Sequence, residues 1–338
     1  MTQTSGLAGG QAGRPPSLVA RGRNLIGDRT FKYLSLVAAL LVLAILLLIL
    51  ITTLKQAWPA FRLMGWRIIT DSTWQPNDPD GDGPLQPEFG ALSIIYGTAY
   101  VSVIALVIAV PVSIAIGLFI TELAPRRLRG AAVTIVDLLA AIPSVVFGLW
   151  GILVFTKFAS PIYDDLHDVL GPVPVLGDIF GANKLGRNFL SAGIIVAIMI
   201  TPIITSITRE VFATVPQDHK QAALALGATK WEMIKGAVLP HSFGGVVGAV
   251  MLGLGRAMGE TIAVALVIGI DFLITPNMFA AGYTIPSVIA NQFGESSGVF
   301  TAALIGIGVI LFVITIIVNY AARFVVRRAE IRMRGAAA

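Results

Sequence analysis

The chain alternates long apolar stretches with shorter polar segments. Six stretches are apolar enough to cross a bilayer, since about 20 apolar residues span its hydrocarbon core. The second and the fifth are longer than a single crossing needs, which predicts tilt or, in the second, a kink at Pro111. The pattern predicts an all-α polytopic membrane protein with six transmembrane helices. The six stretches are residues 33–54, 91–120, 131–155, 189–207, 242–274 and 299–322.

The distribution of basic residues predicts how these spans are oriented. With the N-terminus in the cytoplasm, the segments placed inside carry most of the 24 Lys and Arg residues. Cytoplasmic loops of membrane proteins show this excess, so both termini are expected to be cytoplasmic. The basic groups include Arg126, Arg127 and Arg129 after the second span, and Arg323, Arg327 and Arg328 after the sixth.

Composition along the chain suggests four parts. Residues 1–30 are rich in Gly, Ser, Pro and Arg without a period, which predicts a disordered cytoplasmic tail. Residues 31–90 hold the first transmembrane helix and an external loop. Residues 91–322 form the core, with a cytoplasmic loop at 208–241, and residues 323–338 form a basic cytoplasmic tail.

Composition and missing motifs exclude several functions. The chain is 56% hydrophobic and 13% charged, half the charge of a soluble domain. Without cysteine it has no disulfide, thiolate metal site or thiol nucleophile. The stretch at 181–188 has Arg187 where a phosphate-binding loop needs Lys, so we expect no nucleotide hydrolysis and no cofactor or metal in this chain. Intramembrane protease motifs are absent, and the basic loops do not indicate nucleic-acid binding.

The third span contains a carboxylate and a proline. Pro143 should loosen the helix and free a backbone carbonyl. Asp137 lies near its cytoplasmic end, where it is either a hydrated interfacial carboxylate or part of a gate or substrate path.

The loop at 208–241 predicts two short helices. Pro216 suits the first turn of one, and Gly227 can end it in the left-handed conformation. Thr229 with Glu232 forms a capping box for the next, and Pro240 is expected to end that helix before the fifth span. An Ala-rich helix face allows close approach, so it fits a groove on a partner protein.

The same loop carries a family signature. Gln221-Ala222-Ala223, Gly227 and Leu239-Pro240 resemble the EAA signature of bacterial ABC importer permeases. This chain has Gln221 where that family often has Glu, so a salt bridge to the ATPase is not expected there. The resemblance implies that the loop inserts into a cleft of a cytoplasmic ATPase subunit.

Two opposite charges lie within the fifth span. Arg256 and Glu260 are four residues apart, so on one helix they share a face and can pair. Gly255 and Gly259 beside them would allow close helix contact. Because Arg also matches a phosphate oxyanion, the pair is either structural or part of the substrate path. Weaker candidates for that path are Thr261 and Asn291.

Residues 255–264 and 140–150 resemble the permease subunits of phosphate-specific ABC importers, which have a MetI-like fold. The resemblance implies a non-enzymatic subunit of the bacterial inner membrane. Its implied partners are a sister permease, two copies of an ATPase that binds ATP and Mg, an external phosphate-binding protein and the lipid bilayer. An ABC permease for sulfate or molybdate, an ion-coupled secondary transporter and an assembly scaffold remain alternatives.

Overall fold

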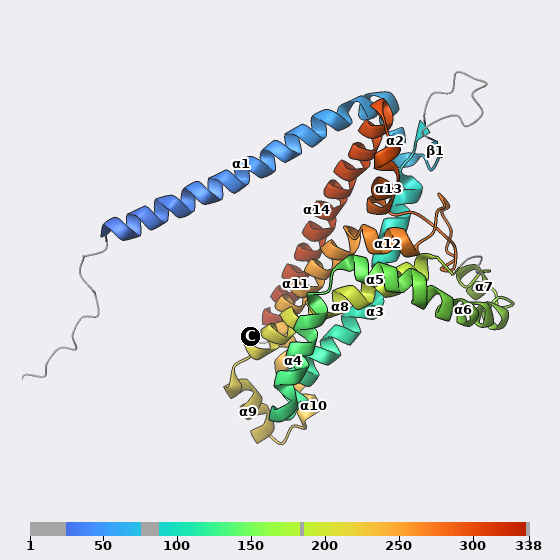
Figure 1. Ribbon diagram of the computed structural model, residues 1–338. Helices are drawn as coiled ribbons and strands as arrows, with labels where there is room; N and C mark the ends of the chain where they lie inside the picture. Colours follow the sequence, from blue (N-terminus) through green and yellow to red (C-terminus); the bar gives the residue numbers. More distant parts are fainter. Residues whose placement is uncertain (1–24, 76–87, 183–185, 336–338) are drawn as a thin grey trace, which may run out of the picture. The chain divides into compact units, whose positions relative to one another are not determined.

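The computed structural model describes residues 25–75, 88–182 and 186–335, which are mostly helical (Figure 1). In chain order the elements are α1 (Leu25–Met64), α2 (Arg67–Thr70), β1 (Trp74–Gln75), β2 (Glu88–Phe89), α3 (Leu92–Leu118), η1 (Phe119–Leu123), α4 (Arg126–Ala140), α5 (Ser144–Trp150), η2 (Gly151–Phe155), α6 (Thr156–Leu170), α7 (Leu176–Ile179), α8 (Phe189–Ala213), α9 (Gln217–Ala225), α10 (Lys230–Met233), η3 (Ile234–Val238), α11 (Leu239–Met258), α12 (Ile262–Val267), α13 (Ile285–Gln292), η4 (Phe293–Glu295) and α14 (Gly298–Gly335). The elements η1, η2 and η3 are π-helical turns, and η4 is a 3-10 turn.

The chain forms two compact units, residues 1–52 and residues 53–338. The described part of the first unit is the N-terminal portion of α1. Its side chains are almost all exposed, because it has no core of its own. Apolar side chains around a whole helix are typical of a segment that lies in lipid or against another subunit. Helix α1 contains the predicted first span and begins at Leu25, inside the predicted tail; residues 1–24 lie outside the described residues.

The core of the second unit lies between α3 and α8, which share the most extensive contact in the chain. Val101 and Ile104 of α3 pack against Ile195 and Ile200 of α8, and all four are buried. Gly193 makes this approach possible, since a Cβ there would lie 2.4 Å from the Ile104 side chain. Small residues at helix contacts are how membrane helices gain close packing.

A second cluster closes the end of the unit where α13 and α14 meet the two-stranded sheet. Strands β1 and β2 pair antiparallel, with Trp74 opposite Phe89. Phe89 stacks on Phe300 of α14, with the ring centroids 5.9 Å apart. The Trp74 indole N–H donates to Gln292 Oε1 at 2.9 Å, so a buried polar group has its partner.

Six candidate membrane spans are present among the described residues, as predicted, but the third lies elsewhere. The helix expected over 131–155 is broken: α4 ends at Ala140, and the membrane helix runs from Ser144 to Leu170. Pro143 explains the break, because it lacks an N–H and disfavours helical geometry in the residue before it. The predicted kink at Pro111 stays a prediction; α3 runs through that residue.

The fifth span also differs from the prediction. It runs from Lys230 to Met258, not over 242–274. The expected stop at Pro240 is wrong, because η3 passes the helix into α11: the Leu239 N–H donates to the Ile234 carbonyl, five residues back. Beyond α12 the chain to residue 284 has no helix. The Tyr96 hydroxyl anchors that segment by donating to the Thr275 carbonyl at 2.6 Å.

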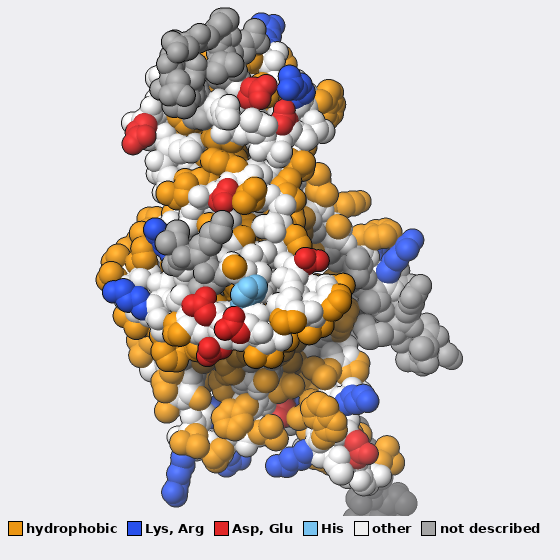
Figure 2. Space-filling model, turned by 90° about the vertical axis from the view of Figure 1, so that its right-hand side faces the viewer, with side chains coloured by type: hydrophobic (Ala, Val, Ile, Leu, Met, Phe, Trp, Pro, Cys, Tyr) orange, Lys and Arg blue, Asp and Glu red, His pale blue; other side chains and the backbone are white. Residues whose placement is uncertain are grey.

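Side-chain types are distributed unevenly over the surface (Figure 2). Apolar side chains cover much of the face shown, as expected where helices contact lipid or another subunit. Acidic side chains gather over α6 and α7, and α6 carries the exposed residues Asp164, Asp165 and Asp168. The predicted cytoplasmic position of the termini, and with it the external position of this acidic group, stays a prediction.

Candidate functional site

The predicted pair of charges lies at a break between two helices. Arg256 is exposed in the last turn of α11, which ends at Met258. Glu260 follows the break and is 7% exposed. Its Oε1 accepts the N–H of Ala263 at 3.3 Å, at the start of α12. No salt bridge joins Arg256 to Glu260, so the expectation that they pair on one helix face is wrong.

Helix α11 ends at Met258. Gly259 is the C-terminal cap of α11, and its N–H donates to the Gly255 carbonyl. With the helix ended, an i, i+4 spacing no longer places two side chains on one face.

The two weaker candidates lie at different places. Thr261 belongs to the same break, where its hydroxyl donates to the Gly259 carbonyl at 3.2 Å. Asn291 is exposed on α13, and no hydrogen bond or salt bridge between described residues joins it to Arg256 or Glu260. Arg256, Glu260 and Thr261 thus lie together at the break, and Asn291 lies on another helix.

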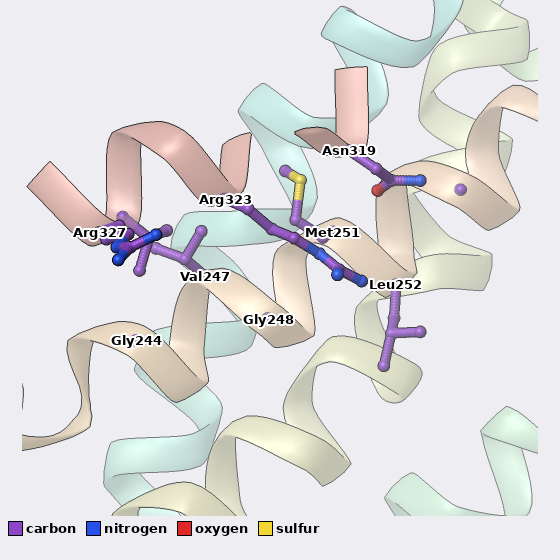
Figure 3. A pocket seen from close by; sticks show the side chains of 10 residues that line it. Gly244, Val247, Gly248, Met251, Leu252, Asn319, Arg323 and Arg327 are labelled. Atoms are coloured by element: carbon purple, nitrogen blue, oxygen red, sulfur yellow. The ribbon is translucent and has the colours of Figure 1, made fainter. Parts of the chain in front are cut away.

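A groove beside this break was not predicted. It has a volume of about 590 Å³ and lies between α11 and α14 (Figure 3). Figure 3 shows the Arg323 side chain extending over α11 toward Leu252, with Arg327 farther along α14. Among the described residues, the lining carries two guanidinium groups and no carboxylate, so it favours an anion. The lining residues are Gly244, Val247, Gly248, Met251, Leu252, Gly255, Asn319, Arg323, Val326 and Arg327.

Sequence reasoning assigned Arg323 and Arg327 to the basic tail instead. Helix α14 continues past both to Gly335, so the predicted boundary at residue 323 falls within a helix. The spacing of Asn319, Arg323 and Arg327, four residues each, is the signal that places them on one face.

Of the two short helices predicted for the loop at 208–241, α9 forms as a separate helix, whereas α10 begins the continuous helix that runs through η3 into α11. Helix α9 follows Pro216, and Gly227 has φ 86° just after its end, the left-handed conformation that glycine tolerates. The capping box is present, since the Thr229 N–H donates to Glu232 Oε2 at 2.8 Å and the Glu232 N–H donates to Thr229 Oγ1 at 3.3 Å. The loop is thus held by its own backbone before any partner binds.

The residues of the signature divide between the two sides of this loop. Gln221, Ala222, Gly227 and Pro240 are exposed. Ala223 and Leu239 are half-buried and pack against a cluster within the chain. Ala223 therefore supports the loop and offers a partner less surface than Ala222 does. The cluster consists of Leu118, Phe212, Val215, Met233, Ile234, Val238 and Val246.

Two exposed apolar residues enlarge the outer face. Leu226 is 90% exposed just before Gly227, and Trp231 is exposed on α10. A free leucine and tryptophan in a polar loop are typical of an interface, where aromatic side chains often dominate the binding energy. Sequence reasoning missed both, although a large apolar residue directly before the glycine stop is a signal for Leu226.

Lys220, one residue before the signature, faces the opposite way. It is buried, and its Nζ donates to Glu122 Oε1 of η1 at 2.6 Å. Asp137 of α4 is exposed and its Oδ1 accepts the Ser206 hydroxyl at 3.5 Å, so both interpretations of Asp137 stay open. Among the described residues, no group of three or more His, Asp or Glu side chains could hold a metal ion.

Comparison with known proteins identifies the class. The family model for the binding-protein-dependent transport system inner membrane component matches residues 109–331. The chain belongs to this family. The relatives compared next are PstC phosphate transport permeases.

Three relatives show how far the similarity extends. The phosphate transport system permease protein PstC of Xylella fastidiosa is 40% identical over 314 residues, which cover 91% of this chain and 94% of that protein. PstC of Mesorhizobium japonicum is 40% identical over 312 residues, covering 92% and 93%. PstC 2 of Mycobacterium tuberculosis is 42% identical over 301 residues, covering 88% and 91%.

Solved structures support the fold. A chain of the bacterial alginate ABC transporter, solved with a periplasmic protein that holds an alginate pentasaccharide, aligns with a TM-score of 0.58 at 17% identity, covering 90% of this chain and 98% of that one. A chain of the inward-facing MetNI methionine ABC transporter aligns with a TM-score of 0.50 at 16% identity, covering 71% and 94%. The predicted MetI-like, all-α membrane fold is confirmed.

Proposed function

We propose that this chain is the permease subunit of an ATP-driven importer of inorganic phosphate in the bacterial inner membrane. The observation that supports phosphate as the substrate is the 40% identity to phosphate transport permeases over nine-tenths of the chain. The chain forms half of the translocation pathway beside a sister permease. An external binding protein delivers phosphate, and two ATPase copies, which hold ATP and Mg, hydrolyse the nucleotide.

The exposed face of the loop at 208–241 is the proposed ATPase contact. Gln221, Ala222 and Leu226 point away from the chain's own core, whereas Ala223 and Leu239 anchor the loop to it. A rigid, capped loop with a small apolar outer face can enter a groove without first becoming ordered, which lowers the entropic cost of binding.

The break after α11 is the proposed point of contact with the anion. An unpaired Arg within a membrane costs at least about 2.5–3.5 kcal/mol on insertion scales. Glu260 does not offset this cost, because it bonds to the backbone of α12. Arg256 is therefore available to an outside partner, and its planar guanidinium suits a phosphate oxyanion. This supports a role in the substrate path over a purely structural ion pair.

The test is phosphate uptake by proteoliposomes that contain the permease, the sister permease, the ATPase and the binding protein. Arg256→Gln should abolish uptake with the complex still assembled, and Arg256→Lys should keep part of it. Arg126→Gln, which changes an exposed Arg on α4, serves as the matched control. Uptake at the wild-type level by Arg256→Gln would exclude the pathway role.

The same assay separates the alternatives. Competition by sulfate or molybdate at phosphate concentrations near saturation would indicate another oxyanion as substrate. Uptake that continues without ATP and stops when an ionophore removes the ion gradient would indicate an ion-coupled carrier.

A further inference from the structure

A buried ion pair joins two segments that are 98 residues apart. Lys220 Nζ donates to Glu122 Oε1 at 2.6 Å, and each side chain is 9% exposed. Lys220 is the buried residue of α9, directly before the exposed Gln221. Glu122 lies in η1, the π-helical turn that follows α3 without interruption. The pair thus ties the inner side of the proposed ATPase contact to the end of a core helix.

The other ion pairs between described residues differ in character. Arg67–Asp71, Arg67–Glu88 and Arg209–Glu210 have at least one partner that is largely exposed. Water and mobile ions screen such pairs, so they constrain their helices weakly. Separating Lys220 from Glu122 would cost more than separating an exposed pair, because each side chain is only 9% exposed. The pair therefore restrains the distance between α9 and η1.

Helix α3 can carry a displacement from that point. It packs along α8 over the most extensive contact of the chain. Residues of α4 also hold η1, since the Arg129 guanidinium donates to the Thr121 carbonyl, next to Glu122. The charged groups facing this place line a cavity of about 320 Å³: Glu122, Arg129, Arg209, Glu210 and Lys220.

We propose that Lys220 and Glu122 are positioning residues that transmit the movement of α9 to α3. They touch neither phosphate nor nucleotide. When the ATPase displaces α9, the pair forces η1 and α3 to follow, and the core helices move with them. The proposal rests on the proposed function, because it assigns to this pair the step that links the ATPase contact to the translocation pathway.

The test compares phosphate taken up per ATP hydrolysed in the reconstituted four-component complex. Glu122→Ala with Lys220→Ala removes both charges, so neither is left buried and unpaired. We expect this double variant to assemble and to hydrolyse ATP, with uptake per ATP lower by about tenfold, within the usual range of coupling between sites. The reversed pair, Glu122→Lys with Lys220→Glu, should recover most of the ratio. Arg67→Ala with Asp71→Ala removes an exposed pair and should leave the ratio unchanged.

A second readout does not depend on the substrate. Because the chain has no cysteine, spin labels can be placed at Phe119→Cys and Phe158→Cys, both exposed positions. Their distance should change when ATP is added to the complex, and that change should be lost in the double alanine variant and return with the reversed pair.

Two results would overturn the pair's role: an unchanged ATP-driven distance change in the double alanine variant, or loss of ATPase binding by that variant. A wild-type complex that shows the distance change without phosphate uptake would refute the proposed function alone.

Discussion

Two pairs of opposite charges in this protein show contrasting outcomes. Arg256 and Glu260 are four residues apart and do not pair, whereas Lys220 and Glu122 are 98 residues apart and meet at 2.6 Å. The first pair is separated because α11 ends between its members. The second is brought together by the apolar cluster under α9. In these two cases, a helix end and a tertiary contact, not the spacing in the sequence, decide which charges meet.

The difference has chemical consequences. The Lys220–Glu122 pair is closed, since both groups are buried and satisfied by each other. At the break, the exposed Arg256 forms no ion pair with a carboxylate among the described residues, and Glu260 accepts a backbone N–H. An ion pair that is shielded from water suits transmission of force, and an exposed cation that is not paired with a carboxylate suits transient binding of an anion.

The largest effect should come from removing one charge of the Lys220–Glu122 pair. Lys220→Met leaves Glu122 buried and unpaired, which should lower the free energy of unfolding by about 3–5 kcal/mol. Chemical unfolding in detergent, followed by circular dichroism, measures the change. Adding Glu122→Leu should restore most of the loss; a single variant as stable as the wild type would show that the pair is hydrated.

A smaller effect is expected at the outer face of the same loop. Ala222→Glu should weaken ATPase association by at least about 2 kcal/mol, or about thirtyfold in Kd, because it places a charge in a packed contact. The permease alone should keep its stability. Ala223→Glu is the informative comparison, since that side chain faces the chain's own cluster and should destabilise the permease itself. Wild-type co-purification of the ATPase with Ala222→Glu would argue against this contact.

Arg256 and Glu260 should show little energetic coupling. Glu260→Ala should cost about 1 kcal/mol, since the Ala263 N–H loses its acceptor, as in loss of a helix cap. In a double-mutant cycle with Arg256→Gln, the interaction energy should stay below about 0.5 kcal/mol. Unfolding in detergent measures each corner of the cycle. A coupling energy as large as that of Lys220 and Glu122 would mean that the two side chains pair in the assembled protein.

The smallest effect concerns the exposed turn before β1. The Thr73 N–H holds the pKa of Asp71 below its ordinary value of 3.8. A carboxyl with a lowered pKa stabilises the fold above its unfolded pKa, and this contribution is lost as pH falls through the folded value. Protection of the Thr73 amide from hydrogen exchange should therefore decrease below about pH 3.8, relative to its neighbours. Asp71→Asn should remove this pH dependence, and persistence of the dependence in that variant would assign it to another group.

Local signals in the sequence predicted much of this arrangement. The length of the apolar stretches predicted six spans, and the Gly227 stop and the Thr229–Glu232 box predicted the turn within the loop, because each signal depends on neighbours in the chain. The third and fifth spans were misplaced. Pro143 breaks a helix, whereas Pro240 lies within one. This difference depends on the hydrogen bonds around each proline, which the residue type alone does not specify.

Some features of the candidate site were likewise predictable from local signals, and others were not. The exposure of Gln221 and Ala222 agrees with the prediction of a loop that faces a partner, whereas Arg256 lies at the end of α11 and not in the middle of the fifth span as predicted. The Lys220–Glu122 pair, the burial of Ala223 and the groove that holds Arg323 do not follow from local signals. They arise from contacts between segments far apart in the chain, which a single sequence does not encode in any short pattern.

The π-helical turn η3 also determines where this chain tolerates a change in length. A π-helical turn holds one residue more than an α-helical turn, while the helices on either side keep their facing. Deleting exposed Gly236 should tighten η3 into an α-helical turn and leave the buried sides of α10 and α11 where they are. Deleting Gly248 in α11 would instead rotate every later residue by about 100°. A chain one residue shorter at 234–238 can therefore keep the same inward-facing side chains, and one shorter within α11 cannot.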